Sequence, residues 1–147
     1  MVMVEDIAQL WAFRDDKFSV MCTKHDHSPD EGVKFLNTIQ TKYEKKNWSS
    51  CMLFNNTKCR ALIPEYINTA SGLELHQFKW LLSDEEIGSI PLEWNYLSGT
   101  GQVLEKKAMI HYTLGGPYFK EYLDCEEAKV WIDEKESMLS CAQGESE

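Results

Sequence analysis

The stretch Ala108-Met-Ile-His111-Tyr-Thr-Leu-Gly115-Gly116-Pro117-Tyr118-Phe119 decides how the rest of the chain is interpreted. Residues 108–112 form a short apolar run with the length and composition of a buried strand. His111 falls where this strand should end, and a Gly-Gly-Pro turn follows directly. Open α/β sheets bind ligands beyond the carboxyl ends of their strands. A neutral imidazole at such an end can ligate a metal, and glycines let backbone N–H groups approach phosphate oxygens. A strand that simply turns, with His111 half-buried, is the alternative interpretation.

Length and composition indicate one globular domain. The chain has 147 residues, of which 43% are hydrophobic, and this is enough for a core. Its net charge of -9 argues against nucleic acid or an anionic membrane as the main partner. No apolar run has the length of a membrane span. The 5 cysteines contain no CxxC pair, so neither a zinc site nor a disulfide framework is expected, and a cytoplasmic location is predicted.

Predicted strands alternate with predicted helices, which favours the α/β class. Residues 1–4 resemble the end of a strand, and Glu5 and Asp6 then open a helix. Further strands are predicted over 18–22 and within 48–54. A helix is predicted over 58–68, in which Pro64 either begins the helical part or kinks it. The other predicted elements are a segment capped by Ser71, an extended segment over 90–96, a short helix over 118–123, a helix over 126–139 and a polar tail over 141–147.

His25 and His27 form an HxH pattern in a polar loop. Alternate residues of an extended segment point the same way, so these two imidazoles have the spacing of metal ligands. A solvated loop is the simpler interpretation, because no third ligand of suitable spacing is near. A metal hydrolase that uses His25, His27 and His111 stays open as an alternative function.

Five blocks of this sequence, in this order, resemble the glycosyltransferase family 8 type of nucleotide-sugar transferase. The similarity runs from about Val4 to about Tyr122. The blocks are Glu5-Asp-Ile-Ala-Gln-Leu10, Lys46-Asn-Trp-Ser-Ser-Cys-Met-Leu-Phe-Asn55, Asn68-Thr-Ala-Ser-Gly72, Leu82 to Asn95, and Ile110-His111-Tyr-Thr-Leu-Gly-Gly116-Pro117.

The resemblance implies a GT-A fold, which is a Rossmann-like α/β layer that binds a sugar nucleotide through a divalent cation. Such enzymes transfer the sugar with retention of its anomeric configuration. In the family an Asp-x-Asp motif and a later histidine hold the metal, usually manganese, and His111 matches that histidine. A metal that bridges two phosphates neutralises charge on the departing nucleotide. Gly115 and Gly116 match the loop that wraps the phosphates, although Gly116 and Tyr118 replace a lysine and a tryptophan that the family often has there.

Asp84 and Glu85 are the candidate catalytic residues that the resemblance implies. They fall in the segment that corresponds to the family's Asp-Gln-Asp block beside the transferred sugar. A carboxylate there can orient sugar hydroxyls, whereas a helix cap made by Ser83 and Glu86 is the structural alternative. The candidate substrate-binding residues Trp48, Ser49 and Ser50 match a block that presents polar groups to the donor or acceptor sugar. For Trp48, stacking on a sugar and core packing are both open.

In the family the Asp-x-Asp motif and the nucleotide-binding strands lie upstream of the stretch that Met1 to Asp6 match. We therefore expect a partial GT-A fold without the N-terminal nucleotide-binding strands, over residues 1–140. The predicted function is metal-dependent, retaining sugar transfer from a nucleotide-sugar donor to an unknown acceptor, with Mn²⁺ bound weakly by this chain alone. A non-catalytic remnant that binds a glycan or a protein is the alternative. Self-association, or pairing with the missing N-terminal half, is the expected partnership.

Overall fold

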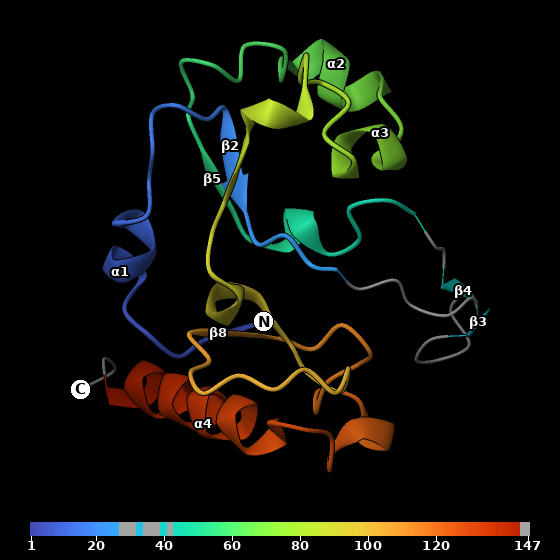
Figure 1. Ribbon diagram of the computed structural model, residues 1–147. Helices are drawn as coiled ribbons and strands as arrows, with labels where there is room; N and C mark the ends of the chain where they lie inside the picture. Colours follow the sequence, from blue (N-terminus) through green and yellow to red (C-terminus); the bar gives the residue numbers. More distant parts are fainter. Residues whose placement is uncertain (27–31, 34–38, 41–42, 145–147) are drawn as a thin grey trace.

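The computed structural model describes residues 1–26, 32–33, 39–40 and 43–144. It shows a mixed α/β fold with small sheets (Figure 1). In the first sheet, β2 (Val20–Cys22) lies between β5 (Met52–Phe54), to which it is antiparallel, and β6 (Ile87–Ser89), to which it is parallel. Met21 pairs with both Leu53 and Gly88, and this register turns Met21 to one face and Val20 and Cys22 to the other.

The second sheet contains the strand that was predicted over 108–112. It is β8 (Met109–His111), which lies between the antiparallel β1 (Val2–Met3) and the parallel β7 (Tyr96–Leu97). β1 confirms the strand expected before the first helix. β3 (Gly32–Val33) and β4 (Ile39–Gln40) form a separate antiparallel pair.

The core fills the space between and outside the two larger sheets. Trp94, which is 1% exposed, packs with Met21 from one sheet and Met109 from the other. The outer face of the first sheet packs against Phe78, and the second sheet packs against Trp131 of α4. In Figure 1, α4 lies along the β8 sheet, while α2 and α3 gather near β2 and β5.

Capping residues begin the short helices. Asp6 caps α1 (Ile7–Trp11), because its side chain accepts a hydrogen bond from the N–H of Ala8 at 2.8 Å. Ser71 and Glu74 form a capping box on α3 (Gly72–His76), which confirms Ser71 as an N-cap. The remaining helical elements are α2 (Pro64–Thr69), α4 (Ala128–Gly144), and the 3₁₀ helices η2 (Trp48–Ser50), η3 (Asp84–Glu86), η4 (Leu92–Asn95) and η5 (Lys120–Tyr122).

Three predicted segments differ from the structure. The helix predicted over 58–68 begins only at Pro64, because residues 58–63 form turns and proline favours the first position of a helix. The segment predicted to be extended over 90–96 contains η4 after Pro91. α4 continues to Gly144, so it enters the segment expected to be a polar tail. Within the described residues, no helix combines the length and the apolar character needed to cross a membrane.

Candidate functional site

His111 lies at the carboxyl end of β8, where the sequence places it. It pairs with Leu97 of the parallel strand β7, and its Nδ1 is 3.1 Å from Oδ1 of Asn95. Asn95 is fully buried, and its Nδ2 donates a hydrogen bond to the carbonyl oxygen of Asn47 at 2.9 Å. Because the NH₂ group of this amide is directed to Asn47, its oxygen faces the imidazole and accepts from Nδ1–H. A proton on Nδ1 leaves Nε2 as the nitrogen that bears the lone pair in the neutral form of a histidine, and a hydrogen bond of this kind fixes the orientation of the ring.

A short segment with two left-handed residues extends this arrangement. Lys45 has φ 59° and Asn47 has φ 65°, a region that asparagine tolerates better than most residues. Nζ of Lys45 donates to Oδ1 of Asp84 at 2.7 Å and to the carbonyl oxygen of Gln77 at 3.2 Å. Oδ1 of Asn47 accepts from the hydroxyl of Thr113 at 3.3 Å. The contacts at both ends therefore hold a strained backbone in one conformation.

These contacts connect residues that are far apart in the sequence. We call them the polar network: Lys45, Asn47, Asp84, Asn95, His111 and Thr113. Lys45 holds Asp84 at one end, and Asn47 holds the pair of Asn95 and His111 at the other. Sequence reasoning gave no role to Lys45, Asn47 or Thr113. The available signal was that Asn47, Asn95 and Thr113 lie in blocks that carry the family resemblance.

Trp48 and Ser49 lie in η2, directly after this segment. Nε1 of Trp48 donates to the carbonyl oxygen of His25 at 2.9 Å, and its half-buried ring packs beside the cluster that contains Phe78. The Ser49 hydroxyl is 2.6 Å from Nδ1 of His76. Ser50 is half-buried, and its N–H donates to the carbonyl oxygen of Asn47. The structure thus gives Trp48 a packing role, and it places Ser49 beside an exposed imidazole.

Gly115 and Gly116 lie in a tight, buried turn after β8. Gly115 has φ 116°, and its N–H donates to the carbonyl oxygen of Tyr112 at 3.3 Å. A Cβ on Gly116 would lie 2.5 Å from Cε1 of Tyr118 and 3.1 Å from Cβ of Tyr112. The turn therefore requires glycine at both positions for steric reasons, whether or not a phosphate binds there.

Asp84 and Glu85 are exposed, and Glu86 has a structural role. The carboxylate of Glu86 accepts from the Ser19 hydroxyl at 2.6 Å and from the N–H of Leu82 at 2.9 Å. The hydrogen bond from Ser19, followed by that from Leu82, lowers the pKa of Glu86 below its ordinary value. Ser83 does cap this turn, but its hydroxyl accepts from the N–H of Glu85, so the expected capping box with Glu86 is not formed.

Asp84 and Glu85 line one open cavity of about 600 Å³ together with Lys24. Nζ of Lys24 donates to the carbonyl oxygen of Ile87 at 2.6 Å and lies 5.7 Å from the ring centroid of Trp48. Two of the predicted carboxylates therefore share a solvent-filled space with a lysine, a charge arrangement suited to a polar ligand.

The described residues do not form a complete manganese site. Among them, no three His, Cys, Asp or Glu side chains are grouped so that they could hold a metal ion. Manganese favours several oxygen ligands, so a single imidazole from His111 is a weak site for it. The HxH pattern is not tested, since His27 lies outside the described residues and the His25 side chain is buried at 7% exposure. All 5 cysteines are free thiols.

The fold is that of a mixed α/β protein, in which His111 lies at the carboxyl end of the parallel pair β7 and β8 and Asp84 lies just before β6 of the other sheet. Among curated proteins the chain is similar to the Arabidopsis thaliana protein named Protein CDI, with 46% identity over 138 residues. The match covers 89% of this chain and 53% of the Arabidopsis protein, so the chain spans about half the length of that relative. No family model matches the chain. No solved structure matches it either.

Proposed function

We propose that this chain is part of a glycosyltransferase that moves a sugar from a nucleotide-sugar donor with retention of configuration, on a partial GT-A fold. The sequence resemblance to family 8 transferases supports the proposal. One structural observation carries it further: Asn47, Asn95 and His111, from three separate blocks of that resemblance, are joined by hydrogen bonds of 2.9 and 3.1 Å. Ordinary core packing does not require a chain of buried amides that ends on an oriented imidazole.

Each residue of the network has a definite task in this proposal. Asn95 fixes the orientation and the tautomer of His111, so that Nε2 is presented as one ligand for a divalent cation. Asp84 is 73% exposed and held by Lys45, and its carboxylate accepts hydrogen bonds from sugar hydroxyls in the adjoining cavity. The other metal ligands are not among the described residues, and sugar transfer is proposed for a protein of the relative's length.

Manganese binding gives the direct test for this chain. Paramagnetic Mn²⁺ broadens nearby amide NMR signals even when it binds weakly. We expect a titration of the ¹⁵N-labelled chain to broaden the signals of Leu97 and Tyr112 first, and UDP-sugars to strengthen the effect. His111→Ala should remove the broadening, and the matched control His76→Ala should leave it unchanged. Broadening that centres on exposed acidic side chains and survives in His111→Ala contradicts the proposal.

A non-catalytic module that binds another protein is the second candidate. Its supporting observation is a set of exposed apolar side chains near the start of the chain: Met1 at 60%, Met3 at 40%, Val4 at 50%, Ile7 at 62% and Trp11 at 56% exposure. Size-exclusion chromatography with light scattering tests this candidate. A concentration-dependent dimer supports it, and a monomer at all concentrations counts against it.

A further inference from the structure

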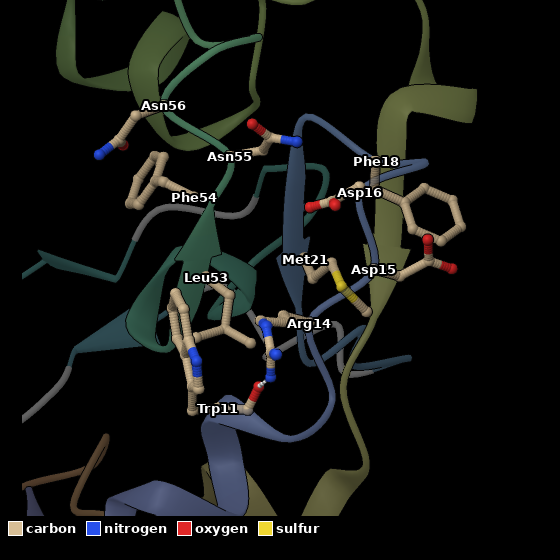
Figure 2. A pocket seen from close by; sticks show the side chains of 10 residues that line it. All are labelled: Trp11, Arg14, Asp15, Asp16, Phe18, Met21, Leu53, Phe54, Asn55 and Asn56. Atoms are coloured by element: carbon tan, nitrogen blue, oxygen red, sulfur yellow. Dashed lines mark hydrogen bonds between the residues drawn. The ribbon is translucent and has the colours of Figure 1, made fainter.

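A pocket of about 280 Å³ opens beside the first sheet (Figure 2). It lies where β5 ends at Phe54 and Asn55, whereas η2 lies at the beginning of that strand. α1 and the connection from α1 to β2 provide the other walls. In Figure 2, Trp11, Leu53 and Phe54 lie on one side, Asp16 and Phe18 on the other, and Arg14 and Met21 between them. The pocket is lined by none of the polar network residues, although Phe18 also lines the cavity that contains Asp84.

The apolar wall of the pocket keeps large aromatic surfaces in contact with water. Trp11 is 56% exposed and Phe54 is 41% exposed. The guanidinium of Arg14 lies 5.3 Å from the Trp11 ring centroid, and its Nη1 donates to the carbonyl oxygen of Trp11 at 3.2 Å. Arg14 thus braces the indole where α1 ends. Single exposed apolar side chains scattered over a surface are ordinary. Several exposed aromatic rings that line one hollow indicate a recognition surface.

The polar rim combines hydrogen-bond donors and acceptors. The Arg14 guanidinium and the side-chain NH₂ groups of Asn55 and Asn56 donate, while the Asp15 and Asp16 carboxylates accept. Oδ1 of Asn55 already accepts from Thr57, which leaves its NH₂ as the group for a ligand. The two carboxylates and one guanidinium give the rim a small net negative charge.

We propose that this pocket binds one sugar ring of a neutral carbohydrate. The C–H face of a sugar ring stacks on an aromatic face, and each hydroxyl both donates and accepts, which matches the mixed rim. A cavity of about 280 Å³ has the size of a small ligand. Asp15 and Asp16 repel a phosphate, and Arg14 repels a cation from the indole, so neither charged class fits as well. This inference does not rest on sugar transfer and goes beyond it.

Titration of the ¹⁵N-labelled chain with methyl glycosides of glucose, galactose, mannose and xylose tests the proposal. At least one of them should shift the indole N–H signal of Trp11 and the side-chain NH₂ signal of Asn56 in a saturable way. Trp11→Ala should weaken this binding about tenfold, because stacking and apolar burial are lost together. Asp16→Asn should also weaken it. Phe13→Ala is the matched control, since Phe13 is an exposed aromatic residue nearby that does not line the pocket.

Several outcomes overturn the proposal. These are no saturable shift with any glycoside, binding that Trp11→Ala leaves intact, or tighter binding of choline or inorganic phosphate at these residues. Shifts confined to Ser49 and the surroundings of His111 would also reject this pocket, while they would support the transfer site. If Trp11→Ala proves unfolded by circular dichroism, the exposed change Asp16→Asn decides between the outcomes.

Discussion

Asn95→Ala is the substitution that most directly tests the polar network. The Asn95 side chain is fully buried, and it bridges the carbonyl oxygen of Asn47 and the imidazole of His111. Removing the amide leaves both partners without this bond. The Asn47 carbonyl is enclosed, since Asn47 is 9% exposed, whereas His111 is half-buried and water can replace the lost oxygen there. The two sites should therefore contribute unequally to the loss of stability.

The expected magnitude follows from these burial states. A buried polar group left without a partner costs about 1–3 kcal/mol. The Asn47 carbonyl keeps a hydrogen bond from the N–H of Ser50 at 3.3 Å, so both losses count in part, and we expect Asn95→Ala to lower the free energy of unfolding by about 1–2 kcal/mol. For a domain of this size, that loss corresponds to a fall in Tm of about 2–8 °C. Urea unfolding followed by circular dichroism measures it, and imidazole ¹⁵N shifts report whether His111 loses its fixed tautomer.

Asn68→Ala, which changes an exposed asparagine in α2, is the control and should alter stability by less than about 0.5 kcal/mol. Equal, small losses in both variants would refute the reasoning, because Asn95 would then not bridge two buried partners. Unchanged imidazole shifts in a destabilised Asn95→Ala variant would refute the orienting role alone.

Three further predictions concern packing, acid stability and thiol chemistry. Gly88→Ala should destabilise the protein by about 1–3 kcal/mol, because the added Cβ would lie 2.5 Å from the Phe18 ring. Gly72→Ala is the control and should stabilise the protein slightly, because nothing lies within 4 Å of its added Cβ. Equal unfolding midpoints of the two variants would contradict this. Since the folded-state pKa of Glu86 is lowered from 4.5, its stabilisation is present above that pH and is lost as the pH falls through the lower folded-state value. Ser19→Ala should therefore lower Tm at neutral pH by more than in acid, and a pH-independent difference would argue against the Ser19 hydrogen bond. Burial raises the pKa of the Cys22 thiol from 9.0 to about 12, so mass spectrometry should find Cys22 unmodified by a thiol reagent until the protein unfolds, and rapid labelling of the folded protein would contradict the burial.

The sequence predicted correctly the elements that depend on residues close together in the chain. The apolar run before His111, the cap at Ser71 and the strand end over residues 1–4 each depend on residues within a few positions, and the structure confirms all three. The helix predicted over 58–68 was wrong in its first half, where residues form turns. Pro64 begins the helix, which is one of the two possibilities that the sequence left open for it.

The polar network could not be predicted in this way, because its contacts join distant residues. Asn47 contacts Asn95 over a separation of 48 residues and Thr113 over 66, and no local period encodes such pairs. The left-handed backbone at Lys45, a residue type that seldom adopts it, also leaves no mark in the sequence. The family resemblance identified most of the blocks that contain these residues, but it did not predict which side chains form hydrogen bonds with one another.

The strand β5 lies between two regions of different chemistry. It has only 3 residues, from Met52 to Phe54, and different chemistry meets at its two ends. η2 and Asn47 precede it, and the Trp11 pocket follows it. Because hydrogen bonds to β2 fix this strand in register, its length separates η2 from that pocket. The cavity of Asp84 lies on the pocket's side, since β6 begins at Ile87, which pairs with Val20 as Phe54 does. Phe18 lines both the pocket and this cavity, so saturation of one should change the affinity of the other.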